Sequence, residues 1–155
     1  MNFDAAFQKL LGYEGGYVND ALDPGKETAY GISKTAYPDE DIKNMTQERA
    51  KMIYARDYWL PCGADRLPAE LRFDVFDAAV HSGVGQSIRW LQRAVGAEAD
   101  GVLGPKTMKA VAECNAPAVH ARFNGHRLIF MTQLKTWSRF SGGWAKRIAM
   151  NLLGE

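Results

Sequence analysis

The sequence predicts a mainly α-helical protein with a small region of loops or a hairpin near residues 17–33. Two observations predict it. Apolar residues recur at spacings of three and four through most of the chain, as on one face of a helix. Turn-forming Gly, Pro, Asn and Asp residues gather between residues 15 and 31. With 155 residues, of which 46% are hydrophobic, the chain is long and apolar enough for a compact domain.

The first expected helix covers the N-terminal residues, and Gly15-Gly16 ends it. Its apolar face follows the helical i, i+3, i+4, i+7, i+8 pattern at Phe3, Ala6, Phe7, Leu10 and Leu11. The next stretch, residues 17–33, contains Asp23-Pro24-Gly25 and Gly31, which favour turns. We therefore expect loops with short extended pieces there.

The later helices are delimited by capping residues and prolines. Thr46 is a suitable N-cap, Pro68 a suitable helix start, and Gly83 and Gly96 suitable stops. The expected helical spans are residues 46–59, 68–83, 85–95, a segment starting at 104–105, residues 117–138, and a last helix after Gly142-Gly143.

Charge divides the chain into two parts. Residues 1–66 carry 8 basic and 11 acidic side chains, a balance of −3, and residues 67–155 carry 11 basic and 7 acidic ones, a balance of +4. We expect the division near residue 66, with residues 1–66 and 67–155 as two lobes that share one core. The basic second half suits contact with an anionic polymer.

Several classes of function are disfavoured. No apolar run approaches the roughly 20 residues of a membrane span, so stable membrane insertion is not expected. Cys62 and Cys114 lie far apart, and the three histidines show no metal-ligand spacing, so no metal or other cofactor is expected. The basic residues are dispersed and no nucleic-acid-binding motif occurs, so nucleic acid is a poor candidate partner. We expect a monomer.

Glu14 is the sharpest candidate for chemistry. It lies 11 positions after Phe3, which returns it to nearly the same side of the expected helix, and it falls in the last turn. Burial and the carbonyl end of the helix dipole both raise the pKa of a carboxyl group placed there. A carboxylic acid that stays protonated near neutral pH can act as a general acid. The alternative is an ordinary solvated residue at a helix end.

Asp23 and Thr28 follow Glu14 in an order that suits hydrolysis. The turn at Asp23-Pro24-Gly25 can fold the loop back toward the helix end. Asp23 could then position a water molecule or stabilise positive charge, and Thr28 could hydrogen-bond the water or the carboxyl group. The alternatives are an Asx-turn for Asp23 and a polar residue at the start of a strand for Thr28.

The chain resembles glycoside hydrolase family 108, a family of the lysozyme-like superfamily that contains phage endolysins and N-acetylmuramidases. The resemblance spans nearly the whole chain. Its motifs are Glu14-Gly15-Gly16-Tyr17-Val18-Asn19-Asp20, Asp23-Pro24-Gly25, Thr28, Tyr30-Gly31-Ile32-Ser33, Tyr58-Trp59, Phe73-Asp74, Gly83-Val84-Gly85, Leu91-Gln92-Arg93-Ala94 and Asp100 through Thr107. The back half resembles the predicted peptidoglycan-binding region that accompanies the catalytic part.

The resemblance implies a lysozyme-like helical fold and hydrolysis of the β-1,4 bond from N-acetylmuramic acid to N-acetylglucosamine in bacterial peptidoglycan. It assigns the catalytic acid to Glu14, with Asp23 and Thr28 as supporting residues. The residues expected to bind substrate are Tyr17, Asn19, Tyr30, Tyr58 and His81. His81 stands where the family commonly has asparagine.

Two alternatives stay open. A lytic transglycosylase cleaves the same bond without adding water and also needs an acid, whereas a non-catalytic wall-binding module would leave Glu14, Asp23 and Thr28 without a purpose.

The N-terminus has neither a basic region nor a long apolar run, so no ordinary secretory signal is expected. The resemblance implies an endolysin made in the bacterial cytoplasm that reaches the wall after a holin opens the membrane.

Overall fold

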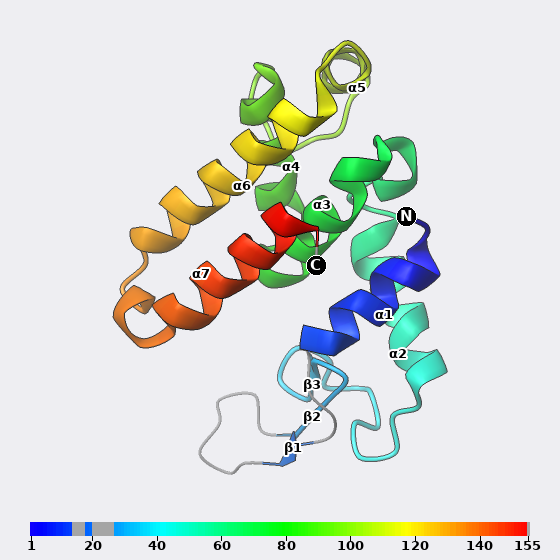
Figure 1. Ribbon diagram of the computed structural model, residues 1–155. Coiled ribbons are helices and arrows are strands. Elements are labelled where there is room, and N and C mark those ends of the chain that lie inside the picture. Colours follow the sequence, from blue (N-terminus) through cyan, green and yellow to red (C-terminus); the bar gives the residue numbers. More distant parts are fainter. Residues whose placement is uncertain (14–17, 20–26, 155) are drawn as a thin grey trace. The chain divides into compact units, whose positions relative to one another are not determined.

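The computed structural model describes residues 1–13, 18–19 and 27–154 and is mainly α-helical (Figure 1), which confirms the predicted fold class. In chain order the elements are α1 (Phe3–Tyr13), β1 (Val18–Asn19), β2 (Glu27–Ala29), β3 (Ile32–Ser33), α2 (Gln47–Tyr54), the π-helical turn η1 (Ala55–Trp59), the 3-10 turn η2 (Ala64–Arg66), α3 (Ala69–Ser82), α4 (Val84–Val95), α5 (Pro105–Ala112), α6 (Ala116–Thr132) and α7 (Trp137–Leu153). They form two compact units. The N-terminal unit is Asn2–Asp57, and the C-terminal unit is Tyr58–Glu155 together with Met1.

The N-terminal unit is built on the apolar face of α1. Ala6, Phe7 and Leu10 are fully buried, as the spacing predicts, and the Asn2 side chain accepts the backbone N–H of Ala5 at 3.0 Å. The ring of Phe7 lies 5.7 Å from that of Tyr54 at the end of α2. The predicted N-cap of α2 is confirmed, because Thr46 Oγ1 accepts the N–H of Arg49 at 3.1 Å.

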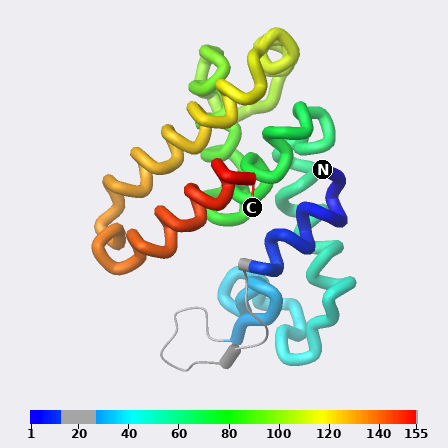
Figure 2. The backbone as a smooth tube through the Cα atoms, viewed as in Figure 1, coloured from blue at the N-terminus to red at the C-terminus, as the bar shows by residue number. Residues whose placement is uncertain are grey.

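The C-terminal unit is organised around α3, which packs against both α4 and α6. Ser87 of α4 donates a buried hydrogen bond to the carbonyl of Val75 in α3 at 2.7 Å. Trp90 of α4 is fully buried and meets Phe123 and Phe130 of α6 edge-on. Figure 2 shows α6 and α7 running side by side as an antiparallel pair.

One buried side chain, Gln92, holds the connection from α4 to α5. Its Nε2 donates to Asp100 Oδ1 (2.6 Å), to the Val102 carbonyl (3.0 Å) and to Thr107 Oγ1 (3.0 Å). Its Oε1 accepts the N–H of Gly101 at 2.8 Å. The hydrogen bond from Gln92 also lowers the pKa of Asp100. The turn predicted at Asp100-Gly101 is therefore fixed to α4 by one carboxamide.

The predicted break at Gly142-Gly143 is wrong, and so is the predicted end of the preceding helix. α6 ends at Thr132, and α7 begins at Trp137 and continues through both glycines. Each glycine inside a helix costs about 1 kcal/mol relative to alanine. The packing of Ile148 and Asn151, which are buried on α7, keeps the helix intact across this site.

The prediction of one continuous helix over residues 46–59 also needs correction. The helix that starts after Thr46 ends at Tyr54, and Ala55–Trp59 forms a π-helical turn instead of its continuation.

Among the residues that the structure describes, no helix is both long and apolar enough to cross a membrane.

Candidate functional site

Three of the predicted site residues, Glu14, Tyr17 and Asp23, lie outside the described residues. Their roles stay predictions. α1 ends at Tyr13 and β1 begins at Val18, so the segment that contains Glu14 and Tyr17 joins these two elements.

Thr28 lies in the middle strand of this sheet. The strands pair in the order β1-β2-β3, both pairs antiparallel, and Thr28 stands opposite Val18 on one side and Ser33 on the other. Side chains alternate along a strand, and the next residue, Ala29, is buried. Thr28 is half-buried and shares with Ser33 the face of the sheet opposite to Ala29. Asn19 of β1 pairs with Glu27 of β2.

A tight turn at Tyr30-Gly31 joins β2 to β3. Both residues have positive φ, 51° for Tyr30 and 77° for Gly31, as a two-residue type I′ turn requires. Glycine adopts this conformation freely, but tyrosine does so at a cost. The side chain of Tyr30 is half-buried. The structure thus places a strained tyrosine at a position where the resemblance implies substrate contact.

Tyr54 ties this turn to α1. Its hydroxyl donates to the carbonyl of Tyr30 at 2.9 Å, and its ring contacts Phe7. Tyr54 itself is 1% exposed. The helix that leads to Glu14 and the hairpin that carries Thr28 are therefore fixed to each other within the N-terminal unit.

Tyr58 and His81 belong to the C-terminal unit. Tyr58 is half-buried on the π-helical turn, and π-helical turns are frequent at functional sites. His81 is exposed in the last turn of α3 and lines a small pocket of about 80 Å³ with Ser82, Met131, Leu134 and Trp144. The structure thus groups Asn19, Thr28 and Tyr30 on one sheet, and groups His81 with α6 and α7. The binding roles of these residues stay predictions.

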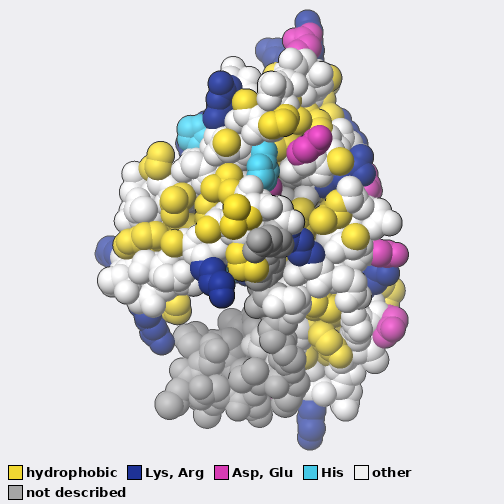
Figure 3. All heavy atoms as spheres, in the orientation of Figure 1, with side chains coloured by type: hydrophobic (Ala, Val, Ile, Leu, Met, Phe, Trp, Pro, Cys, Tyr) yellow, Lys and Arg dark blue, Asp and Glu magenta, His cyan; other side chains and the backbone are white. Residues whose placement is uncertain are grey.

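Three aromatic side chains of α7 form a partly exposed cluster. We call Trp137, Phe140 and Trp144 the aromatic surface. The Phe140 and Trp144 rings are stacked with centroids 5.6 Å apart, Trp137 and Trp144 lie 6.2 Å apart, and Phe140 is 43% exposed. Arg139 lies over the Phe140 ring at 5.1 Å. Figure 3 shows hydrophobic side chains over the region of α6 and α7.

The other two tryptophans are core residues. Trp59 is 2% exposed and Trp90 fully buried. The spacing of Trp137, Phe140 and Trp144, three and then four residues, could have identified one helical face. It could not show that this face is partly exposed, because exposure depends on packing against other helices.

Asp74 and Asp77 of α3 are buried. Asp77 accepts hydrogen bonds from Arg127, Arg147 and Asn151, at 2.6, 2.9 and 3.2 Å. Burial alone would raise the pKa of Asp77, but the charges of Arg127 and Arg147 lower it well below its usual range. Burial raises the pKa of Asp74 despite its contact with His120.

Comparison with known proteins identifies two regions. Residues 7–83 match the family described as Glycosyl hydrolase 108, and residues 86–149 match the Predicted Peptidoglycan domain. The solved structure of Brucella abortus SagA is 33% identical to this chain and superposes with a TM-score of 0.88. That match covers 97% of this chain and 91% of SagA. No curated protein sequence matches the chain. The two regions support a function in degrading or binding peptidoglycan.

Proposed function

Because the chain belongs to the glycosyl hydrolase 108 family, we propose that it is an N-acetylmuramidase. The bond cleaved is the β-1,4 linkage between N-acetylmuramic acid and N-acetylglucosamine. The observation that carries the proposal is the link from Phe7 through Tyr54 to Tyr30, which fixes the hairpin with Thr28 to the helix that precedes Glu14. This link supports a single catalytic region in the N-terminal unit.

In the proposed reaction Glu14 is the general acid. It protonates the glycosidic oxygen as the bond breaks and an oxocarbenium-like transition state forms. Asp23 stabilises the positive charge or orients the attacking water, and the Thr28 hydroxyl holds that water. The position of Thr28 on the half-exposed face of β2 supports this role, because a buried hydroxyl could not reach substrate.

The aromatic surface and His81 supply glycan contacts in this proposal. Flat aromatic faces offer large apolar area at little entropic cost, and Arg139 and His81 add polar groups beside them. The proposal gives the C-terminal unit the task of holding the polymer.

The experiment is mass spectrometry of fragments released from purified peptidoglycan by four proteins. Glu14→Gln and Thr28→Val are compared with the wild type and with Glu48→Gln, an exposed glutamate of α2 that serves as the matched control. We expect reducing N-acetylmuramic acid ends from the wild type and the control. Loss of the general acid should lower the rate about 10²- to 10⁴-fold.

The alternatives give different products. Anhydro-muramic ends would identify a lytic transglycosylase. Wall binding without any fragments would leave only a binding module. Full activity in Glu14→Gln would remove Glu14 from the mechanism.

The resemblance to phage endolysins supports a further part of the proposal, that the protein lyses a host from within. It would accumulate in the cytoplasm and reach the wall once a holin opens the membrane. Expression in bacteria tests this, because lysis should follow chloroform treatment of the cells and should be absent with Glu14→Gln. Lysis during expression without any membrane damage would contradict the holin route.

A further inference from the structure

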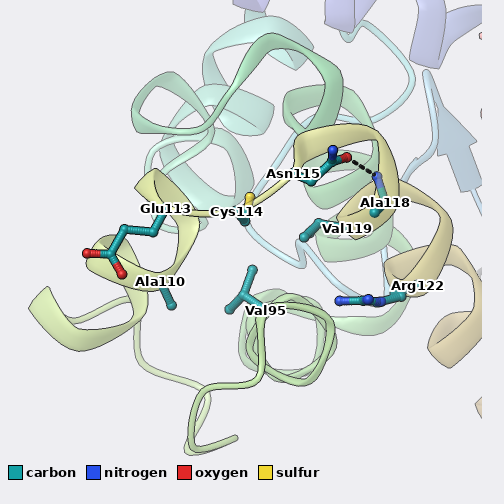
Figure 4. Close-up of a pocket in the computed structure, with 8 residues that line it drawn as sticks. All are labelled: Val95, Ala110, Glu113, Cys114, Asn115, Ala118, Val119 and Arg122. Carbon is teal, nitrogen blue, oxygen red and sulfur yellow. Dashed lines mark hydrogen bonds between the residues drawn. The ribbon is translucent and has the colours of Figure 1, made fainter.

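The C-terminal unit has a pocket whose lining includes no residue of the aromatic surface. This pocket, of about 300 Å³, opens where the ends of α4 and α5 meet the start of α6 (Figure 4). It is lined by Val95, Ala110, Glu113, Cys114, Asn115, Ala118, Val119 and Arg122. All of these residues lie in the region that matches the Predicted Peptidoglycan domain.

The pocket combines a small aliphatic patch with polar groups, among them the guanidinium of Arg122. Val95, Ala110 and Val119 present small aliphatic groups, and Val119 is 2% exposed. Arg122 extends from α6 across the pocket toward Val95 (Figure 4). Arg122 forms no hydrogen bond or ion pair with any residue in the described part of the chain.

Among the described residues, no acidic group pairs with Arg122 in the pocket. The carboxylate of Glu113 points outward in Figure 4, and one of its oxygens lies 4.0 Å from Lys109 Nζ. Asn115 Oδ1 is occupied, because it accepts the N–H of Ala118 at 3.0 Å as the N-cap of α6. Residues 114–154 contain no Asp or Glu at all. A ligand with a carboxylate and a small apolar group would complement this pocket.

We propose that this pocket binds the free carboxylate end of the peptide stems of peptidoglycan, with Arg122 holding the carboxylate. The methyl group of a terminal alanine would rest on Val95, Ala110 and Val119. The proposal rests on the proposed function only in taking peptidoglycan as the substrate. It names the peptide, and not the sugar chain, as what the C-terminal unit recognises at this place.

The direct test is a titration with N-acetyl-D-alanyl-D-alanine, followed by the methyl NMR signals of Val95 and Val119. The C-terminal amide of the same dipeptide is the ligand control. Arg122→Gln removes the charge, and Arg93→Gln removes a charge from an exposed arginine of α4 that does not line the pocket. We expect shifts with the acid and not with the amide, and about tenfold weaker binding in Arg122→Gln alone. Equal shifts with acid and amide, or an unchanged Arg122→Gln, would overturn the proposal.

Cys114 offers a second measurement that needs no change in charge. Both cysteines are free thiols, but Cys62 is fully buried and burial raises its pKa to about 12, whereas Cys114 is half-buried at the pocket. N-ethylmaleimide should therefore label Cys114 selectively and abolish the dipeptide shifts. Cys114→Ser treated in the same way should keep them. Retained binding in the labelled wild type would place the ligand elsewhere.

Binding to the wall separates this proposal from the muramidase proposal. Arg122→Gln should bind intact peptidoglycan more weakly than the wild type and bind peptide-free glycan strands equally well. Equal loss on both polymers would mean that the pocket holds sugar. If the wild type releases no reducing muramic ends from either polymer, the muramidase proposal fails, while the dipeptide titration still decides the pocket.

Discussion

Arg127 and Asp77 form a salt bridge in which neither side chain is exposed to solvent. Nη1 of Arg127 lies 2.6 Å from Oδ2 of Asp77, and Arg147 of α7 neutralises the other carboxylate oxygen. The pair joins α3 to α6 and, through Arg147, to α7. One carboxylate thus connects three helices of the C-terminal unit.

Removing the charge of Asp77 should strongly destabilise the protein. Asp77→Asn leaves Arg127 buried without an anion, and breaking one side of a buried pair typically costs about 3–5 kcal/mol. Asp74→Asn, one turn away on α3, is the matched control, because burial already disfavours the charge of Asp74. We expect the control to change the free energy of unfolding by less than about 1 kcal/mol. Urea denaturation at pH 7 measures the free energy of unfolding of both variants. Equal losses in Asp77→Asn and Asp74→Asn would contradict the role of Asp77 as the counter-ion of Arg127.

The same pair predicts a loss of stability in acid. The folded-state pKa of Asp77 is lowered, so its contribution is fully present above the unfolded pKa of about 3.9 and is lost as the pH falls below it. The free-energy difference between wild type and Asp77→Asn should therefore shrink below about pH 4. A difference that stays constant from pH 7 to pH 3 would show that the carboxylate charge is not what stabilises the fold.

The buried cluster around Asp77 should contain ordered water. Five side-chain atoms there are buried without a hydrogen-bond partner among the described residues, namely Asp74 Oδ1, Asn124 Oδ1, Asn151 Oδ1, and Nε and Nη2 of Arg127. Buried polar groups are usually satisfied, and internal water is the common partner when protein groups are absent. A crystal structure at high resolution should show water bonded to Arg127. A dry cluster would mean that these helices pack differently in the crystal.

Replacing Tyr30 should separate stability from function. Asparagine tolerates a positive φ better than tyrosine, so Tyr30→Asn should stabilise the protein by about 0.5–1 kcal/mol. The hydrogen bond from Tyr54 survives, because it uses the Tyr30 carbonyl. If the phenol contacts substrate, the variant should also hydrolyse peptidoglycan less efficiently. Thermal unfolding and fragment release measure the two effects, and a less stable variant would show that ring packing outweighs the strain.

Phe140→Ala should weaken binding to insoluble peptidoglycan while leaving the fold intact. Phe140 is 43% exposed, so truncation should cost less than about 1 kcal/mol of stability, against about 3–5 kcal/mol for Trp90→Ala in the core. Leu60→Ala, at a residue 65% exposed, controls for the loss of apolar surface in general. Sedimentation with purified walls gives the bound fraction. Equal binding by the wild type, Phe140→Ala and Leu60→Ala would remove the aromatic surface from the glycan site.

Local sequence signals predict what local interactions determine. The periodicity from Phe3 to Leu11 and the cap at Thr46 depend on residues within one or two turns, and both are confirmed. Gly142-Gly143 predicts a helix break that does not occur, because Ile148 and Asn151 of the same helix are buried against other helices. The local sequence does not reveal that packing. The resemblance names the family correctly, and the roles of Glu14, Asp23 and Thr28 stay predictions.

Residues whose roles depend on partners far away in the chain could not be identified from the sequence alone. Nothing around Asp77 indicates a buried ion, since its neighbours in the sequence do not include its partners. Arg122 carries no motif, and only the meeting of α4, α5 and α6 makes it the cation of a pocket. Such residues need a fold before they can be recognised.

The three partners of Asp77 are encoded 50, 70 and 74 residues after it. Closing such long loops is entropically costly and tends to come late in folding. By contrast, Gln92 meets its partners within 8 to 15 residues. On a ribosome, the connection from α4 to α5 can therefore assemble early. Asp77 can meet Arg127 only after α6 has been made, and its remaining partners, Arg147 and Asn151, only after α7 has left the exit tunnel.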